Sequence, residues 1–402
     1  MPLFIGRVAS ILGVIVLLFL VVWMAIGRDW RALLSDPPKD TDILFWSQSQ
    51  RDTGFRMLDR IPFIAGNNSI PSGEEKPLPE GDPFVLDFEV SKYITENRHS
   101  AIVVLHKGSV RLEEYGLDFS AEGRWTSFSV GKSLTSTLIG AAIKDGYIES
   151  VDEPVTKYIQ ALSGSAYDDV TIEQLLTMTS GVAWNEDYED PTSDVALFAN
   201  HEPEDGLPQI VSYMRGLGRA HEPGKVWNYS TGETNLVGIL LGNAIEKPIA
   251  TYLSEKIWTP YGMGADASWL LGLDGNELSG CCIQAATRDM ARFGQFMLDG
   301  GVIDGVATLP SDWIDNATRK HVDETGPAGR GYGYQWWVYD GGAFAAIGIF
   351  GQGILIDPSR DLVIAVNSSW QTAEGFRTGE NERRTTFYRQ VQEAIDREIS
   401  NG

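Results

Sequence analysis

Strand-like segments lie near both ends of this 402-residue chain, and a long, mostly helical stretch separates them. An apolar run from Ala101, a Lys107-Gly108 turn and a second run to Tyr115 predict an early β-hairpin. The other strand patterns come late, at 332–339, 343–349, 353–356 and 362–366. Residues from about 150 to 300 show helical patterns between glycine and proline loops, and 382–399 predicts a final helix. We therefore expect one sheet built from distant segments, with a mainly helical lobe inserted between them.

The N-terminus carries an apolar segment from Val8 to Ile26 that is interrupted by a single serine. Nineteen residues rise about 28 Å in an α-helix, which is close to the hydrocarbon thickness of a bilayer. A cleaved signal peptide usually has a shorter apolar core and small residues at its cleavage site, which this segment does not supply. We expect residues 1–30 to form an uncleaved membrane anchor and 31–85 a tether, leaving 86–402 as one folded domain.

The formal net charge of −23 and the pI near 4.6 argue against a nucleic-acid-binding protein, which needs clustered cations. Cationic residues flank both ends of the apolar segment, so the positive-inside rule fixes no orientation. A bulky acidic domain behind one N-terminal span is most simply exported. We therefore expect the domain to be periplasmic or otherwise extracytoplasmic.

The cysteines and histidines give no sign of a metal site or a disulfide framework. Cys281 and Cys282 are adjacent, and because adjacent cysteines rarely bridge each other without strain we expect buried structural thiols. The five histidines are scattered, without the His-x-x-x-His or Cys-x-x-Cys spacing of zinc sites. We expect neither a metal nor an organic cofactor.

Ser129 and Lys132 lie one turn apart at the start of an apolar helix predicted over Val130–Lys144. A serine hydroxyl is a poor nucleophile until a neighbouring group takes its proton, which a lysine at this spacing can assist. Gly131-Lys132-Ser133 also resembles the end of a phosphate-binding loop, but Thr126 occupies the position where that loop requires glycine. This excludes a nucleotide site and leaves two interpretations, an activated serine or a solvated pair on an amphipathic helix.

A second cluster, Pro223–Gly232, contains Tyr229 between a Pro-Gly turn and a helix that begins near Thr234. A phenol is normally protonated at neutral pH, but a lysine ammonium beside it stabilises the anion, and the phenolate can then act as a general base. The alternative is a loop tyrosine that packs on Trp227. No Gly-x-Ser-x-Gly motif is present, so the sequence does not support the usual esterase geometry.

In their order and spacing these motifs resemble the serine β-lactamase and penicillin-binding-protein superfamily, in the class C-like branch that contains esterases and 6-aminohexanoate-dimer hydrolase. The resemblance covers residues from about 90 to 398 and rests on Ser129-x-x-Lys132, Tyr229-Ser230-Thr231, Leu175–Gly181, Gly146–Val155 and Gly333–Trp337. It implies an α/β (α+β) fold of the β-lactamase type. In that fold an antiparallel sheet is flanked by helices and joined to the helical lobe at about 150–300.

The resemblance also implies roles for individual residues. Ser129 matches the nucleophile that is acylated, Lys132 the lysine that tunes proton transfer, and Tyr229 the base that later protonates the leaving group. The family stabilises the oxyanion with two backbone N–H groups, one from the nucleophile and one from a late edge strand. Here these are the N–H groups of Ser129 and Ile349, with Gly351 as the neighbouring alternative.

Two departures from the family pattern bear on the substrate. β-Lactamases carry a Lys/His-Thr-Gly triad on the late strand, whose cation and hydroxyl help to hold the substrate carboxylate, but this chain has Ala346-Ile347-Gly348. Thr231 replaces the amide of the family's Tyr-x-Asn motif. We therefore expect hydrolysis of small-molecule esters or amides without a demanding carboxylate anchor, and not efficient β-lactam turnover.

The loop 184–190 is rich in acidic and aromatic residues. In the amide-hydrolysing branch such loops contact the amine end of the substrate, which makes Asp187 and Tyr188 candidate substrate-binding residues, and Trp336 is a further candidate for covering the cleft. A solvated charged face is the alternative. Other functions stay open, namely a β-lactamase, a D-amino-acid peptidase, or a non-hydrolytic sensor of cell-wall fragments that keeps the fold.

Overall fold

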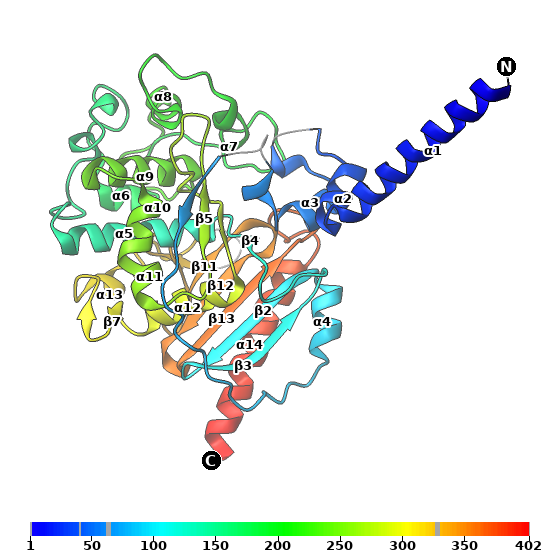
Figure 1. Cartoon of the computed structure of the whole chain (residues 1–402). Helices are drawn as coiled ribbons and strands as arrows, with labels where there is room; N and C mark the ends of the chain where they lie inside the picture. Colours follow the sequence, from blue (N-terminus) through cyan, green and yellow to red (C-terminus); the bar gives the residue numbers. More distant parts are fainter. Residues whose placement is uncertain (1, 40–41, 62–65, 326–329, 402) are drawn as a thin grey trace.

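The computed structural model describes residues 2–39, 42–61, 66–325 and 330–401 (Figure 1). Its largest sheet has seven strands in the order β3-β2-β13-β12-β11-β10-β9, and every neighbouring pair is antiparallel. The strands are β2 (His99–His106), β3 (Ser109–Tyr115), β9 (Gly331–Tyr332), β10 (Trp337–Val338), β11 (Phe344–Ile347), β12 (Gly353–Asp357) and β13 (Leu362–Ser368). Since β2 of the early hairpin pairs with β13, with Val104 opposite Ile364, the expected sheet of distant segments is confirmed.

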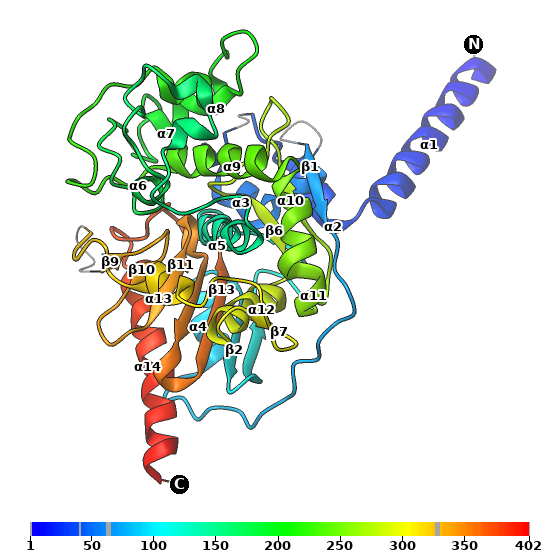
Figure 2. The ribbon, with the colours of Figure 1, turned by 90° about the vertical axis from the view of Figure 1, so that its left-hand side faces the viewer.

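Helices cover both faces of this sheet, as Figure 2 shows for α12 (Thr287–Leu298) and α14 (Glu380–Asn401). Val103 and Leu105 of β2 belong to the apolar cluster that contains α12, whereas Ile102 and Val104 belong to the cluster that contains α14. Successive side chains of a strand point to opposite faces, so a strand covered on both sides is apolar in a continuous run. The predicted final helix is confirmed as α14, and the short α4 (Val90–Glu96) packs beside it.

The helical part of the molecule is organised around α5 (Val130–Asp145), which is buried from residue 130 to 142. Its buried polar side chains bond to the surrounding segments, as the Thr135 hydroxyl does to the Ser279 carbonyl and the Ser136 hydroxyl to the Tyr334 carbonyl. Its main partner is α9 (Thr231–Ile245). The shorter helices nearby are α6 (Ile172–Leu176), α7 (Asp194–Leu197), α8 (Gln209–Arg215), α10 (Ile249–Leu253) and α11 (Thr259–Tyr261). The predicted helix after Ser129 is confirmed by α5.

The region at about 150–300 is not helical throughout. It contributes β5 (Ala267–Leu270) and β6 (Ile283–Ala285) to a second sheet of four antiparallel strands in the order β1-β5-β6-β4. The outer strands are β1 (Asn67–Ile70) and β4 (Trp125–Thr126). The sequence analysis did not show these two strands, because strands this short carry no visible period.

Residues 31–85, expected to form a tether, include elements that pack on the folded body. Besides β1, the region contains most of α2 (Arg28–Ser35) and all of α3 (Gln48–Gly54). Leu33, Trp46 and Leu58 lie in one buried apolar cluster with Leu270 of β5. These apolar residues are few and irregularly spaced among polar ones, which is why the composition of the segment indicated a tether.

Cys281 and Cys282 are joined by a disulfide, so the prediction of two buried thiols is wrong. The chain bends at Cys282, where φ is +72°, and both residues pack in the cluster of Leu33 and Trp46. The prediction relied on how rarely adjacent cysteines bridge, and the sequence does not reveal the bend that accommodates this bridge.

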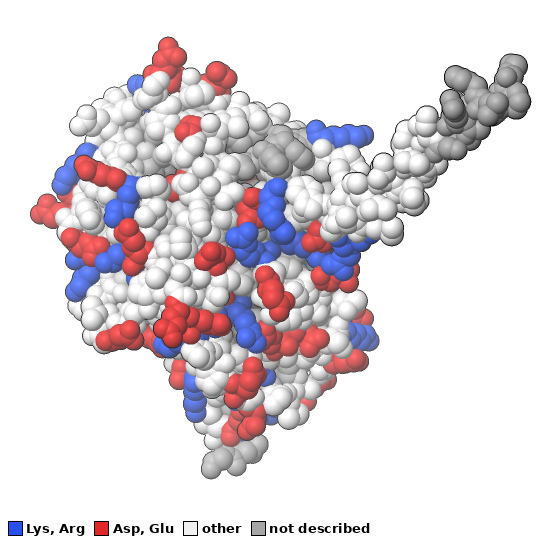
Figure 3. Space-filling view, in the orientation of Figure 1, with Lys and Arg blue, Asp and Glu red and all other residues white. Residues whose placement is uncertain are grey.

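The N-terminal helix α1 (Pro2–Ala25) projects from the body in Figure 1, and apolar side chains between Ile11 and Met24 are exposed along it. In Figure 3 the described part of α1 shows no charged side chain, whereas the body carries both signs intermixed. Within the described residues, no single helix is long and apolar enough to cross a bilayer, but residues 11–25 and α2 meet both criteria together as a pair bent by 117°. The expected single membrane-spanning helix is therefore not supported in that form.

Candidate active site

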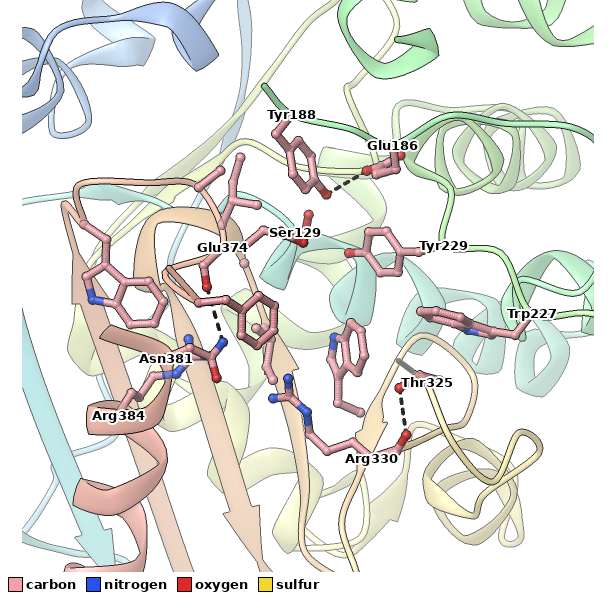
Figure 4. A pocket seen from close by; sticks show the side chains of 17 residues that line it. Ser129, Glu186, Tyr188, Trp227, Tyr229, Thr325, Arg330, Glu374, Asn381 and Arg384 are labelled. Atoms are coloured by element: carbon pink, nitrogen blue, oxygen red, sulfur yellow. Dashed lines mark hydrogen bonds between the residues drawn. The ribbon is translucent and has the colours of Figure 1, made fainter. Parts of the chain in front are cut away.

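A cavity of about 260 Å³ lies where the start of α5, the end of β11 and loops of the helical part meet (Figure 4). Ser129, Tyr188, Tyr229 and Ile349 line it, so the fold brings together four of the residues that the sequence singled out. Figure 4 shows the hydroxyl groups of Tyr188 and Tyr229 directed toward Ser129. The cavity therefore centres on the serine of the Ser-x-x-Lys motif.

The backbone around Ser129 offers two hydrogen-bond donors to the cavity. Gly348 lets the end of β11 approach, because a Cβ there would lie 2.8 Å from the Ser127 carbonyl oxygen and 3.1 Å from the Ser129 nitrogen. In the described part of the chain, the N–H groups of Ser129 and Ile349 donate to no protein group. Ser129 and Ile349 both line the cavity, and two N–H groups without a protein acceptor suit the stabilisation of an oxyanion. Gly351, the alternative to Ile349, does not line the cavity.

Lys132 is buried, with 1% of its surface exposed, and lies one turn after Ser129 on α5. Its ammonium donates to the Thr231 hydroxyl at 2.8 Å and to the Gly280 carbonyl at 2.9 Å. Burial lowers the pKa of the lysine to about 8, although the negative charge of Glu186 acts in the opposite direction. Lys132 is thus able to hold or release a proton close to neutral pH.

Tyr229 precedes α9 and lies between Ser129 and a group of aromatic rings. Burial raises the pKa of its phenol well above the usual value and the charge of Glu186 raises it further, which outweighs the lowering by the hydroxyl of Ser129. The ring stacks on Trp337, with 5.7 Å between centroids, and lies 5.2 Å from the Lys132 ammonium. The resting phenol is therefore protonated, unlike the phenolate that the sequence argument considered.

Glu186 is a site residue that the sequence analysis missed. Its carboxylate lines the cavity and accepts hydrogen bonds from the Thr231 N–H at 2.9 Å and the Tyr188 hydroxyl at 2.8 Å. It also accepts from the Thr231 hydroxyl and the Trp184 indole N–H. Asp187, the carboxylate chosen from the sequence, is exposed and does not line the cavity. The acidic loop was recognised, but only the orientation of its backbone shows which carboxylate faces inward.

Trp337, and not Trp336, lines the cavity. Trp336 is fully buried and packs against Phe293 and Phe344, with 6.2 Å and 5.2 Å between ring centroids. Neighbouring residues at the start of β10 point to opposite sides of the sheet. Trp336 therefore does not border this cavity, and the sequence did not distinguish it from Trp337 because it did not define where the strand begins.

Two buried arginines, Arg330 and Arg384, also line the cavity, on the side opposite Tyr188 in Figure 4. Their exposed fractions are 6% and 2%. Arg330 donates to the Tyr339 hydroxyl at 3.3 Å, and Arg384 donates to the Gln352 carbonyl at 3.1 Å. Each guanidinium also lies over a ring, at 5.0 Å from the centroid of Trp337 and 4.7 Å from that of Trp370.

Neither Arg330 nor Arg384 forms an ion pair with any of the residues that the structure describes. The Arg330 Nε also lacks a hydrogen-bond partner there, and burial lowers the pKa of Arg384. Glu374 also lines the cavity but pairs with neither arginine in the described chain. Burying a cation without a counter-charge is costly, so the two guanidinium groups are suited to an anion. No sequence signal marked these residues, since an arginine in a loop or in a polar helix is usually solvated.

An antiparallel sheet covered by helices on both faces, with a Ser-x-x-Lys helix start beside the end of β11, defines a β-lactamase-like α/β fold. The Beta-lactamase family model matches residues 91–387. The chain therefore belongs to the Beta-lactamase family of hydrolases, within the serine β-lactamase and penicillin-binding-protein superfamily. In the described parts of the chain, no three His, Cys, Asp or Glu side chains gather in a way that could hold a metal ion.

A 6-aminohexanoate-dimer hydrolase from Paenarthrobacter ureafaciens is 29% identical over 335 residues, covering 78% of this chain and 84% of the relative. Among solved structures, a candidate 6-aminohexanoate-dimer hydrolase from Bacillus anthracis has a TM-score of 0.75 at 23% identity, covering 87% of this chain and 94% of that one. A family VIII carboxylesterase has a TM-score of 0.58 at 15% identity, covering 77% and 94%. At these identities the two structures show the shared fold alone.

Proposed function

We propose that this protein is a serine hydrolase that cleaves an ester or amide bond through an acyl-enzyme at Ser129. The observation that carries the proposal is the composition of the cavity. A serine hydroxyl, a tyrosine hydroxyl and two free backbone N–H donors converge there, with the buried amine of Lys132 behind them. These are the groups that nucleophilic acyl transfer requires: a nucleophile, a route for its proton and an oxyanion site.

In the proposed reaction, the Ser129 Oγ attacks the substrate carbonyl carbon, and its proton passes to the pair of Tyr229 and Lys132. The oxyanion that forms accepts hydrogen bonds from the N–H groups of Ser129 and Ile349. When the tetrahedral intermediate collapses, the bond to the leaving group breaks and Tyr229 returns the proton to the departing oxygen or nitrogen. Water then attacks the acyl-enzyme by the same proton route, releasing the acid and restoring Ser129.

Lys132 is the group that makes this pair basic. The phenol of Tyr229 keeps its proton because burial and Glu186 raise its pKa, whereas burial lowers that of Lys132 to about 8. The neutral amine therefore accepts the proton that Tyr229 relays from Ser129. Because the two groups are coupled, the acid limb of the pH–rate profile reports one apparent pKa that belongs to the pair.

We further propose that the substrate carries a carboxylate, which Arg330 and Arg384 bind. A guanidinium donates in a planar fork that matches a carboxylate, and both arginines are buried without an anionic partner among the described residues. The strand residues Ala346-Ile347-Gly348 supply no cation, as the sequence indicated. The cations come instead from Arg330, directly before β9, and Arg384 in α14. An amide with a free carboxylate, as in the dimer after which the Paenarthrobacter relative is named, has this chemistry. Tyr188 is proposed to cover the bound substrate.

A fluorophosphonate probe tests the hydrolase proposal, because it reacts with an activated serine hydroxyl. We expect mass spectrometry to find the label on Ser129 in the wild type and no label in Ser129→Ala. Ser133→Ala is the matched control, since Ser133 lies one turn further along α5 and donates to the Gln335 carbonyl at 2.7 Å. A folded wild type that takes no label would sink the proposal, and label without ester turnover would favour the ligand sensor.

We also propose that residues 1–30 anchor the hydrolase to a membrane and that the domain lies outside the cytoplasm. The exposed apolar side chains between Ile11 and Met24 support the anchor, as does the absence of charged side chains on the described part of α1 in Figure 3. The full chain is expected to sediment with membranes and to resist an alkaline carbonate wash, whereas a chain without residues 1–27 should stay in the supernatant. Recovery of the full chain in the supernatant would contradict the anchor.

A further inference from the structure

The carboxylate of Glu186 is saturated with hydrogen bonds from within the chain. Thr231 contributes its N–H and its hydroxyl, and the other two donors are the Tyr188 hydroxyl and the Trp184 indole N–H. An ionised carboxylate offers about four lone-pair positions, so its capacity as an acceptor is filled. Glu186 is therefore poorly placed to bind a substrate amine, although it lines the cavity.

The Thr231 hydroxyl connects Glu186 to the buried lysine. It accepts a hydrogen bond from the Lys132 ammonium at 2.8 Å and donates its own proton to Glu186. Because a hydroxyl has one proton, these two hydrogen bonds run in one direction, from the ammonium to the hydroxyl and from the hydroxyl to the carboxylate. The carboxylate also sits at the N-terminus of α9, where free backbone N–H groups favour a negative charge. Glu186 is thus linked to Lys132 through a single hydroxyl.

The surroundings of Lys132 contain little other charge. On α5 its neighbour toward the cavity is Ser129, the segment before β6 presents the Gly280 carbonyl, and the loop before α9 presents the protonated phenol of Tyr229. Among the described residues, Glu186 is the one charge found to act on the lysine. Glu233, the other acid at the start of α9, accepts instead from Ser180.

Resting on the proposed hydrolase activity, we propose that Glu186 is a positioning residue that acts through the Thr231 hydroxyl. It sets the pH at which the pair of Lys132 and Tyr229 becomes able to take the proton of Ser129. A negative charge near the pair favours the form that still holds both protons. Removing that charge lowers the pH at which the pair releases its first proton. This holds whether Lys132 or Tyr229 keeps the second proton.

The test is the pH dependence of kcat/KM for a neutral p-nitrophenyl ester. In Glu186→Gln the midpoint of the acid limb should move to lower pH by on the order of one unit, the size expected for a charge a few ångströms away. Thr231→Val, which keeps the N–H and removes the hydroxyl, should move it in the same direction. Thr231→Ser should restore the wild-type midpoint. Asp187→Asn, which removes the adjacent exposed carboxylate, should leave it unchanged.

A lower plateau with an unchanged midpoint in both Glu186→Gln and Thr231→Val would overturn this inference, because it would show that Glu186 only supports the loop. That result would leave the proposed hydrolase intact, since Ser129 would still be labelled by the fluorophosphonate. Failure of the label on Ser129 would instead remove the hydrolase proposal itself. Using two variants keeps the test informative if one of them does not fold.

Discussion

Replacing Lys132 by methionine should lower ester hydrolysis by about 10²–10⁴-fold, the range typical for the loss of a positioned proton acceptor. Methionine has a length similar to that of lysine, so the helix around Ser129 should keep its packing. What disappears is the amine that accepts the serine proton through Tyr229. The measurement is kcat/KM for a neutral p-nitrophenyl ester at pH 8, near the pKa of the buried lysine.

The same substitution should change the pH dependence of stability. The folded chain holds Lys132 at a pKa of about 8, below the ordinary value of 10.5 that applies to the unfolded chain. Between pH 8 and pH 10.5 the unfolded chain binds more protons at Lys132 than the folded chain does, so the free energy of unfolding rises with pH in this window. Below pH 8 the lysine destabilises the folded state by its full amount. The difference in pKa corresponds to roughly 3 kcal/mol.

Methionine removes that penalty, but it leaves the Gly280 carbonyl without its donor, at a cost of about 1–3 kcal/mol. The variant should therefore be more stable than the wild type below pH 8, by on the order of 1 kcal/mol, and less stable above pH 10.5. Denaturant unfolding at several pH values measures the free energy of unfolding. Lys144→Met, at an exposed position of the same helix, is the control and should change neither activity nor this pH dependence.

A Lys132→Met variant that keeps wild-type activity would show that the lysine is not the proton acceptor. An active-site group that weakens the fold is the expected signature of a site selected for chemistry and not for stability. If the variant instead proves less stable at every pH, the lysine is mainly a hydrogen-bond donor that holds α5 to the segment containing Gly280.

The parts of this molecule that the sequence predicted well have long, regular patterns. The continuous apolar run at 101–105, the Lys107-Gly108 turn and the following strand pattern form β2 and β3, and the apolar helix after Ser129 forms α5. The proximity of Ser129 and Lys132 needed only the geometry of one helical turn. Such features depend on neighbours in sequence, and a sequence shows these directly.

The features that sequence reasoning missed depend on packing between distant segments. Choosing between Glu186 and Asp187, or between Trp336 and Trp337, requires knowing which side of a loop or strand faces a cavity whose other walls lie elsewhere in the chain. Arg384 is the clearest case. A charged residue in a polar C-terminal helix is normally solvated, and only its position over a distant tryptophan and its contact with a carbonyl bury it.

Replacing Arg384 by glutamine should raise the KM for a substrate that carries a carboxylate by about 10- to 100-fold, because hydrogen bonds to charged groups contribute roughly 1.5–3 kcal/mol. A neutral substrate of the same length should be affected much less. One suitable pair is mono-p-nitrophenyl adipate and its methyl ester, which differ in the acyl half. A second pair, N-hexanoyl-6-aminohexanoate and its methyl ester, places the carboxylate in the leaving group. The pair that responds identifies the half of the substrate that faces the arginines.

Arg384→Lys should recover only part of the affinity, since an ammonium is a point charge without the planar fork of a guanidinium. Arg330→Gln should act on the same member of each pair, because both arginines line one cavity. Arg377→Gln is the control, as Arg377 is exposed and paired with Glu189. An equal loss on charged and neutral substrates would mean that Arg384 supports the fold through Trp370. A rise in KM confined to the substrates that carry a carboxylate would explain why this family member has no cation on β11. The positive charge would come instead from the C-terminal helix and the segment before β9.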